Sequence, residues 1–364
     1  MDQIGVSERL IRPHLLRMKP YGYIPPLEVQ AEDAGIPIER LIKLDGNENP
    51  YGCSPRVKDA LSKYPYYHIY PDSEQRQLRK ALQNYAGVSA DQIVVGSGSD
   101  EIIDFIMRLF INPGDRVINC VPTFGVYHFS TESHGGTSIA VPRDESFAID
   151  VPAVKKAIDQ GTKVVFVASP NNPSGNTTPK ADILHLLDNN VIVVIDEAYY
   201  EFGGQTMIPL VASHDNLIVL RTFSKWAGLA GLRVGYGIFP KNIARHLFRI
   251  KPPYNVNAAA QIAALESLRD LDYLQQTIKA IVSERERLSA KLAQTGALTP
   301  WPSEANFVLC SVTNNQASGI YHELKRRGIL VRFFDTPLLN NYLRISVGKP
   351  EHTDALLAAL SQIC

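Results

Sequence analysis

The chain has 364 residues, of which 45% are hydrophobic and 20% are charged. This composition is typical of a folded protein with a large buried core, and the length allows two or three domains. Lysine plus arginine and aspartate plus glutamate both number 37, so the balance of charge indicates neither a nucleic-acid partner nor a membrane-surface partner.

The chain carries no recognisable targeting or membrane segment. Its start lacks the basic residues and apolar core of a signal peptide, and no aliphatic run approaches the ~20 residues of a spanning helix. The four cysteines are far apart and the nine histidines are scattered, which predicts neither a disulfide framework nor a metal site. We therefore expect a cytoplasmic protein without a bound metal.

Apolar runs typical of strands alternate with helical patterns through the middle of the chain. The expected strands lie near 92–96, 115–121, 137–141, 163–168, 191–195, 216–221 and 233–239. Such alternation predicts an α/β fold with a mainly parallel, seven-stranded sheet sandwiched by helices.

The first of these strands ends in a Gly/Ser turn that passes directly into an amphipathic helix. Free N–H groups at Ser99 and Asp100 and the helix dipole would make this turn a cradle for an anion. An ordinary helix cap by either side chain is the alternative. A dinucleotide-binding fingerprint is excluded, because Glu101 stands where that motif needs its third glycine.

Two further strands end in polar residues. The run at 163–168 leads into Pro170-Asn171-Asn172-Pro173, which would present Asn172, although turn chemistry alone also explains these residues. The continuous apolar run at 191–195 leads to Asp196 and Tyr199 at the carboxyl end of a strand, where ligands gather in open α/β sheets. A carboxylate that caps the next helix is the alternative for Asp196.

The strand at 216–221 precedes the most informative segment, which contains Lys225. Thr222 and Ser224 flank this lysine with hydroxyls, and Arg233 follows eight residues later. A lysine that attacks a carbonyl needs a desolvated or cation-rich setting, and the hydroxyls and the arginine suit a phosphate. The combination predicts a Schiff-base lysine beside a phosphate site, with a solvated turn as the alternative.

The last third of the chain changes character. A helical pattern over 258–295 predicts one long helix that links the sheet to a second domain, and we expect its charged run at 283–287 to face solvent. Strand-like runs near 305–311, 329–333 and 342–347 then predict a smaller α+β domain. The expected domains are 46–280 for the large unit and 281–364 for the small one.

Taken in order, these segments resemble the fold type I, pyridoxal phosphate (PLP)-dependent aminotransferases of class II, from about residue 40 to residue 350. Within that superfamily the chain looks like the histidinol-phosphate aminotransferases. The supporting motifs are Lys19-Pro20-Tyr21, Leu44-Asp45-Gly46-Asn47-Glu48-Asn49-Pro50-Tyr51-Gly52, Pro122-Thr123-Phe124 and Leu343-Arg344-Ile345-Ser346-Val347-Gly348. The resemblance implies that residues 1–45 pack with the small domain or with a dimer partner.

The resemblance also implies roles for individual residues. Lys225 would bind the cofactor aldehyde and move a proton, Asp196 would keep the pyridine nitrogen protonated, and Phe124 would stack on the ring. Tyr199 and Asn172 would hydrogen-bond the ring hydroxyl. The groups expected to hold the phosphate are Ser99, Asp100, Thr222, Ser224, Arg233 and, from the neighbouring subunit of a homodimer, Tyr51. The alternative for Phe124 is a buried core aromatic.

Substrate binding would rest on Arg332, Arg344, Tyr21 and Asn172. The two guanidinium groups would grip the phosphate of L-histidinol phosphate in one half-reaction and a carboxylate of glutamate or 2-oxoglutarate in the other. The alternative for Arg332 is a surface ion pair.

The implied activity is histidinol-phosphate transamination in histidine biosynthesis, giving imidazole acetol phosphate and L-glutamate. Three alternatives stay open: an aromatic amino-acid aminotransferase, a PLP-dependent decarboxylase of a phosphorylated amino acid, and a non-catalytic PLP-fold binding protein.

Overall fold

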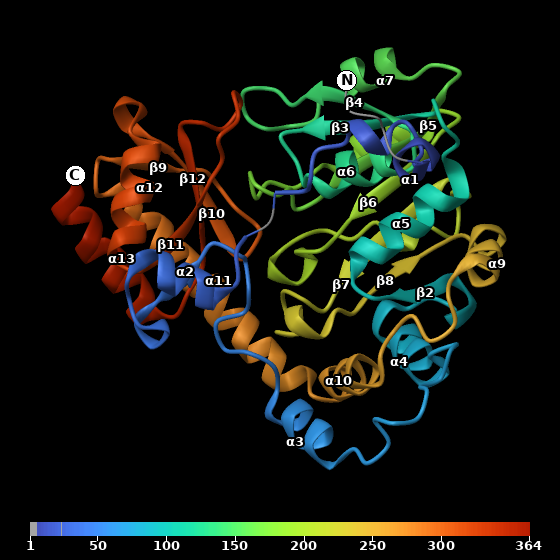
Figure 1. Cartoon of the computed structure of the whole chain (residues 1–364), viewed down its shortest axis with the longest axis horizontal. Helices are drawn as coiled ribbons and strands as arrows, with labels where there is room; N and C mark the ends of the chain where they lie inside the picture. Colours follow the sequence, from blue (N-terminus) through green and yellow to red (C-terminus); the bar gives the residue numbers. More distant parts are fainter. Residues whose placement is uncertain (1–5, 23) are drawn as a thin grey trace.

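The computed structural model describes residues 6–22 and 24–364 and contains two β-sheets (Figure 1). The larger sheet has the strand order β2-β8-β7-β6-β5-β3-β4. Its strands are β2 (Ile93–Gly96), β3 (Arg116–Val121), β4 (Thr137–Pro142), β5 (Thr162–Ala168), β6 (Ile192–Asp196), β7 (Leu217–Thr222) and β8 (Gly235–Ile238). Only β8 runs antiparallel to its neighbours, so the mainly parallel, seven-stranded sheet predicted from the sequence is confirmed.

Helices cover both faces of this sheet. One face packs against α5 (Ser99–Phe110), α6 (Val126–Ser133) and α9 (Lys241–Ile250). The other packs against α4 (Arg76–Ala86), α7 (Val151–Ala157), α8 (Lys180–Leu187) and α10 (Ala258–Arg269). Neighbours along a strand join different cores: Val164 and Phe166 face the first layer, and Val165 and Val167 face the second. Burial on both faces explains the unbroken apolar runs in the sequence.

The smaller sheet has the order β1-β11-β12-β10-β9. Its strands are β1 (Ile42–Leu44), β9 (Leu298–Pro300), β10 (Phe307–Val312), β11 (Ile329–Phe333) and β12 (Tyr342–Ser346), with α12 (Ala317–Arg326) and α13 (Pro350–Ile363) packed beside them. Strand β1 pairs in parallel with β11, so the chain just before residue 45 is built into the small sheet. The two three-residue strands, β1 and β9, are too short to give a sequence pattern.

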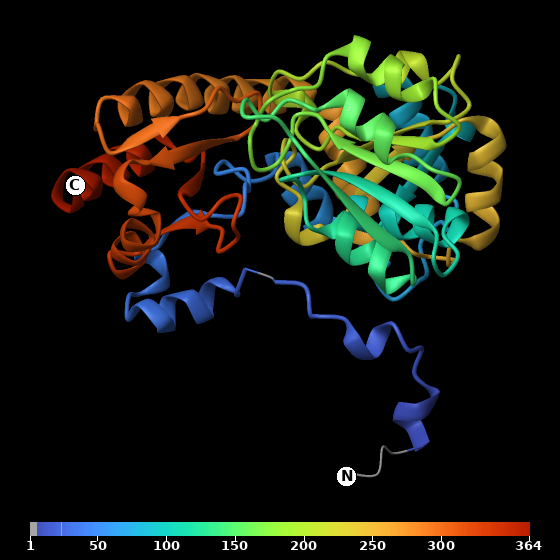
Figure 2. The same cartoon turned by 90° about the horizontal axis from the view of Figure 1, so that it is seen from above.

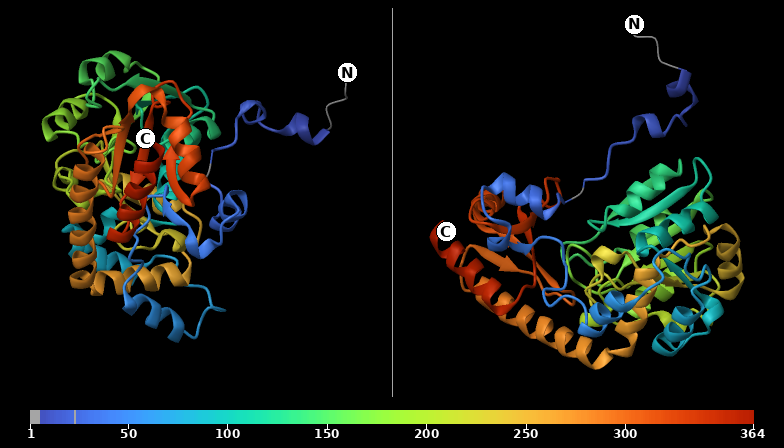
Figure 3. Two further views of the ribbon diagram at one scale, coloured as in Figure 1. Left: turned by 90° about the vertical axis from the view of Figure 1, so that its left-hand side faces the viewer. Right: turned by 60° about the horizontal axis from the view of Figure 1, so that its bottom comes forward.

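The connection between the domains differs from the single helix that the sequence pattern predicted. Two helices, α10 and α11 (Leu271–Ala293), are separated by Asp270, whose φ of −124° and ψ of 44° break the helical path. Figure 3 shows α11 running from the large domain along the small one.

The charged run on α11 is not simply a solvated face, so that prediction was wrong in part. Glu284 and Arg285 are each only 5% exposed. One guanidinium nitrogen of Arg285 donates to the backbone carbonyls of Phe202, at 3.1 Å, and Ala305, at 3.0 Å. A buried charge persists where its donors are satisfied, and here those donors join the two domains.

The chain before β1 forms α1 (Val6–Leu10) and α2 (Leu27–Ala34). Figure 2 shows α1 lying apart from the two domains, whereas His14, just after it, hydrogen-bonds the Ser133 carbonyl of the large domain at 3.2 Å. Helix α3 (Pro55–Lys63) then packs on α10. The domain limits of residues 45 and 280 stay proposals. Across residues 6–22 and 24–364, every helix is too short or too polar to cross a bilayer.

Candidate active site

A cavity of about 990 Å³ lies between the large and small domains, at the carboxyl ends of β5, β6 and β7. Parallel strands end there on one edge, which is where open α/β sheets place their ligands. All of the site residues predicted from the sequence line this cavity except Tyr51. Residues that are far apart in the chain, from Tyr21 to Arg344, are thereby brought together.

Lys225 lies in the turn that follows β7, with its side chain directed into the cavity. Its Nζ donates to the backbone carbonyl of Gly46 at 3.1 Å. Burial lowers the pKa of Lys225 to about 8, and the Arg344 and Arg233 cations add to the lowering against the opposing pull of Glu48. The neutral amine that a nucleophile requires is therefore far more populated near pH 7 than for an ordinary lysine, although the ammonium form still predominates.

Asp196 ends β6 and is only 4% exposed. Its Oδ2 accepts a hydrogen bond from the Tyr127 hydroxyl at 2.6 Å, and its Oδ1 accepts from the Ala198 N–H at 3.1 Å. Burial raises the pKa of Asp196 to about 6 despite these two bonds. Among the described residues no lysine, arginine or histidine forms an ion pair with it, so this carboxylate would gain from a cationic ligand in the cavity.

Tyr199 is positioned by Asn47, a residue of the motif at 44–52 for which the sequence suggested no role. The Asn47 side-chain amide donates to the Tyr199 hydroxyl at 3.0 Å. Asn47 adopts a left-handed backbone with φ of 54°, which asparagine tolerates better than most residues, and its Oδ1 accepts from Ser346 at 2.8 Å. The small sheet therefore fixes a phenol that belongs to the large domain.

The turn between β2 and α5 forms an open cradle. Ser99 and Asp100 occupy the first turn of α5, and their side chains do not cap it, so the capping alternative is not what the structure shows. The Thr222 hydroxyl donates a hydrogen bond to the Ser224 hydroxyl at 2.9 Å. Arg233 reaches the same place and forms an ion pair with Asp100 at 2.8 Å. Unsatisfied helix N–H groups, two hydroxyls and a guanidinium form a donor set suited to a phosphate.

Glycine is required in this cradle. A Cβ on Gly98, whose φ is +83°, would lie 2.4 Å from the Arg233 guanidinium, and a Cβ on Gly235 would lie 2.5 Å from the Ser99 backbone nitrogen. The glycines therefore let β8 and Arg233 approach the start of α5 closely.

Arg332 and Arg344 are direct neighbours across the antiparallel pair β11–β12. Arg344 is buried, and it donates to Asn172 Oδ1 at 2.6 Å and to the Asp45 carbonyl at 2.5 Å. No carboxylate pairs with either guanidinium among the described residues, which does not favour the ion-pair alternative for Arg332. The Arg344 Nε is also buried without a partner there. Two adjacent cations without a counter-charge are a site for an anion.

Tyr21 and Phe124 complete the cavity wall. Tyr21 comes from the segment before α2 and packs edge-on against Phe129, with ring centroids 5.6 Å apart. Burial and the Asp100 carboxylate raise the pKa of Tyr21, and the Arg332 and Arg344 cations partly oppose that rise. Phe124 is half-buried and meets Tyr127 edge-on at 5.7 Å.

Tyr51 lies outside the cavity of its own chain. It is half-buried against the main core, and the Lys349 ammonium lies 5.8 Å from its ring centroid. Its proposed place in the site of a second subunit therefore stays a prediction.

Comparison with known proteins agrees with this geometry. Residues 39–360 match the family model for aminotransferase class I and II. A histidinol-phosphate aminotransferase from Dehalococcoides mccartyi is 53% identical over 89% of this chain and 91% of its own. One from Roseiflexus castenholzii is 48% identical over 97% and 98% of the two chains. The chain belongs to the histidinol-phosphate aminotransferase family of class I and II aminotransferases.

A solved structure supports the same fold. The histidinol-phosphate aminotransferase from Sinorhizobium meliloti, crystallised with pyridoxal-5'-phosphate, has a TM-score of 0.89 and 27% identity, and the match covers 97% of each chain. The family and the fold predicted from the sequence are confirmed.

Tyr127 was not predicted from the sequence as a site residue, and neither Asn47 nor the Gly46 carbonyl was assigned a role. Asn47 and Gly46 lie in the quoted motif at 44–52, which offered a signal. Tyr127 lies within α6, where the sequence pattern predicts only a buried core aromatic, so nothing in the sequence pointed to its contact with Asp196.

Proposed function

We propose that this aminotransferase uses PLP to transfer an amino group between L-histidinol phosphate and 2-oxoglutarate. The observation that carries the proposal is the pairing, in one cavity, of a buried Lys225–Asp196 centre with two uncompensated arginines. The Lys225–Asp196 centre suits the cofactor, and the pair of arginines suits a phosphorylated amine.

The residues present fit PLP. The cradle of Ser99, Thr222, Ser224 and Arg233 offers donors for its phosphate, and Asp196 offers a carboxylate for a pyridinium nitrogen. A positive ring nitrogen would oppose the effect of burial and lower the pKa of Asp196, because the buried anion would gain a counter-charge. Tyr199 and Asn172 remain the candidates for the ring hydroxyl, and Phe124 for its face.

When bound, PLP supplies an aldehyde for the amino group and a conjugated ring that takes up electrons released at the substrate carbon. Lys225 supplies the amine that holds the cofactor aldehyde and the base that removes the proton from the substrate carbon. Its lowered pKa suits both tasks, since a base works best with a pKa near the operating pH. Asp196, which accepts a hydrogen bond from Tyr127, would keep the ring nitrogen of bound PLP protonated.

Arg332 and Arg344 account for the phosphorylated substrate. A phosphate dianion offers three oxygen acceptors to two planar guanidinium forks, and it neutralises two charges that β11 and β12 place side by side. Glutamate would present its side-chain carboxylate to the same pair. Asn172 already accepts from Arg344 and so orients that guanidinium toward the cavity.

The proposed functional unit is a homodimer. The loop between α3 and α4 exposes Tyr66, Tyr67, Ile69 and Tyr70, of which Tyr70 is 78% exposed and stacks on Tyr254 at 4.6 Å. An apolar, aromatic patch of this kind is typical of an interface, and a second copy of the chain is the occupant that the family resemblance implies. Sedimentation should report a dimer, and Tyr70→Glu should shift it toward monomer.

A coupled assay with the purified holoenzyme tests the activity. With histidinol phosphate and 2-oxoglutarate as substrates, we expect glutamate to form, with parallel double-reciprocal plots that indicate a ping-pong order. Histidinol without its phosphate is the matched control and should react far more slowly. Equal or faster turnover of phenylalanine would identify an aromatic aminotransferase instead, and release of carbon dioxide would identify a decarboxylase.

A further inference from the structure

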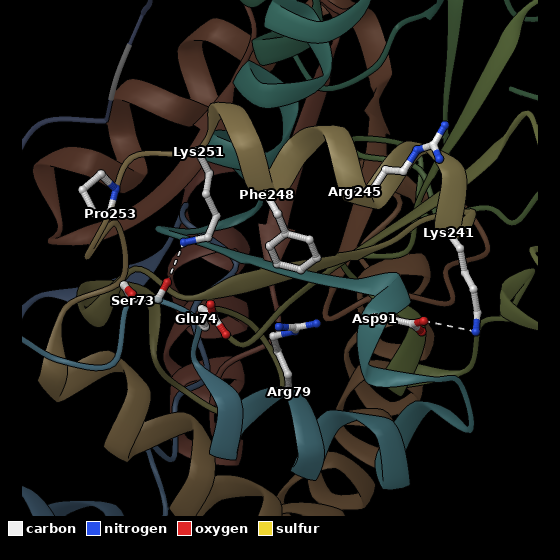
Figure 4. Close-up of a pocket in the computed structure, with 9 residues that line it drawn as sticks. All are labelled: Ser73, Glu74, Arg79, Asp91, Lys241, Arg245, Phe248, Lys251 and Pro253. Atoms are coloured by element: carbon white, nitrogen blue, oxygen red, sulfur yellow. Dashed lines mark hydrogen bonds and ion pairs between the residues drawn. The ribbon is translucent and has the colours of Figure 1, made fainter.

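A second cavity, of about 530 Å³, lies on the flank of the large domain between α9 and α4 (Figure 4). None of the residues that line it also lines the active cavity. Helix α9 follows β8, and α4 precedes the edge strand β2, so the pocket rests against the edge of the large sheet. Its volume falls within the range typical of small-molecule sites.

The charges around this pocket do not balance. Four cations and two carboxylates line it. Asp91 pairs with Lys241 at 3.1 Å, and Glu74 pairs with Arg76, outside the pocket, at 3.2 Å. The remaining cations are Arg79, Arg245 and Lys251, and none of them forms an ion pair with a carboxylate within residues 6–22 and 24–364.

Arg79 is fixed at the pocket floor. Its Nε and Nη2 donate to the Ala90 carbonyl at 3.0 and 2.6 Å, and its guanidinium lies 4.4 Å from the ring centroid of Phe248. These contacts fix the plane of the group and leave Nη1 without a hydrogen bond in the described part of the chain. Burial lowers the pKa of Arg79, so the cation is held where solvent compensates it poorly.

Lys251 and Arg245 provide the other donors. The Lys251 ammonium donates to the Ser73 carbonyl at 2.6 Å and to Asn255 Oδ1 at 3.1 Å, which leaves one of its three protons free. Burial lowers the pKa of Lys251 as well. Arg245 is exposed on α9, and Figure 4 shows it at the edge of the pocket with its guanidinium pointing away from Phe248 and Arg79.

We propose that this pocket binds a small organic phosphate. A phosphate group has enough acceptors for an oriented guanidinium and an ammonium. It would give both half-buried cations an anion within ion-pairing distance, which none of the nearby carboxylates (Asp72, Glu74, Asp91 and Glu101) provides. The cavity is much larger than one phosphate ion, and Phe248 with Pro253 gives it an apolar wall for the organic part of the ligand.

The pocket is also connected to the cradle in the active cavity. Asn255, which accepts from Lys251, donates to Glu101 Oε2 at 2.7 Å. The same carboxylate oxygen accepts from the Ser97 backbone N–H at 2.6 Å, in the turn that precedes Ser99. A ligand that engages Lys251 therefore contacts a continuous hydrogen-bonded path to the proposed cofactor-phosphate turn.

Calorimetric titration of the holoenzyme with ribose 5-phosphate tests the proposal, with ribose as the matched probe without the phosphate. Because the active cavity also suits a phosphate, the titration is repeated with Arg332→Gln, which weakens only that site. We expect a binding event that survives in Arg332→Gln, is absent with ribose, and weakens tenfold or more in Lys251→Gln and in Arg245→Gln. Arg249→Gln, an exposed α9 position outside the pocket, should bind as the unchanged protein does.

Three outcomes would overturn the proposal. The first is the loss of every binding event in Arg332→Gln, which would assign the probe to the active cavity. The second is unchanged affinity in both Lys251→Gln and Arg245→Gln. The third is equally tight binding of ribose, or of succinate to Arg332→Gln, which would reject recognition of a phosphate. Each result is independent of whether the enzyme transaminates histidinol phosphate.

Discussion

The two halves of the active cavity are built in different ways. The proposed cofactor half, with Asp196, Thr222 and Lys225, comes from adjacent strands of one sheet that is buried on both faces. The proposed substrate half joins Arg332 and Arg344 of the small sheet to Tyr21, which comes from the segment before α2. The first half is preorganised by one sheet that is packed on both faces, whereas the second depends on how three segments meet.

This difference predicts that damage to the cofactor half removes the chemistry itself. Lys225→Ala deletes the amine that serves as both nucleophile and base, so kcat should fall at least ~10³-fold, the upper part of the range for one acid–base group. The measurement is single-turnover glutamate formation together with the absorbance of bound cofactor. Bound cofactor without turnover is expected, and normal turnover in this variant would contradict the assignment of Lys225.

Damage to the substrate half should instead change selectivity. Arg332→Gln removes one of the two cations on the substrate phosphate, which should cost about 3 kcal/mol, or roughly a hundredfold in kcat/KM. The loss should appear with histidinol phosphate and not with histidinol. Arg327 is exposed on the surface nearby, so Arg327→Gln provides the control and should leave kcat/KM unchanged. An equal loss with both substrates would place Arg332 in the chemistry rather than in phosphate recognition.

The same contrast explains what the sequence revealed. Asp196, Asn172 and Lys225 each follow an apolar run within a few residues, so strand patterns were enough to place each of them after a strand, and the family resemblance supplied their shared site. The pairing of Arg332 with Arg344 depends on the register of two strands. No local pattern encodes that register, and only the family resemblance pointed to it.

Burial was the second property that the sequence concealed. Arg285 lies in a run of charged residues that resembles a solvated face, yet backbone carbonyls from two distant loops satisfy it inside the protein. The break at Asp270 was likewise invisible, because the residues on both sides favour a helix.

The pKa of Lys225 gives a stability test of the cofactor half. In the cofactor-free protein this pKa is about 8, against an ordinary value of 10.5, so between these values the unfolded chain binds more protons than the folded one. Stability should therefore rise with pH from about 8 to 10.5. Lys225→Met removes the cost of the buried cation and should be more stable at pH 7 by up to about 3 kcal/mol.

Urea unfolding at pH 7 and at pH 10.5 measures that difference. It should nearly vanish at the higher pH, where the lysine is neutral in the folded protein and about half neutral in the unfolded chain. A difference that does not change with pH would mean that packing, rather than charge, separates the two proteins.

The smallest effect concerns the support of Asp196 by Tyr127. Tyr127→Phe removes a 2.6 Å hydrogen bond to the carboxylate but keeps the stacking on Phe166 at 4.6 Å. That bond lowers the pKa of Asp196, so its loss should raise the pKa above about 6 and favour the neutral acid. A neutral acid attracts a pyridinium less, and the affinity for PLP should fall about tenfold, as expected for one hydrogen bond to a charged group.

Titrations of the cofactor followed by absorbance at pH 6 and pH 8 separate this electrostatic role from a packing role. The loss in Tyr127→Phe should be larger at pH 6, because more of the carboxyl is protonated there. Equal losses at the two pH values would show that the hydroxyl supports the shape of the site and not the charge on Asp196. In that case the cofactor half would owe its preorganisation to the packed aromatic layer alone.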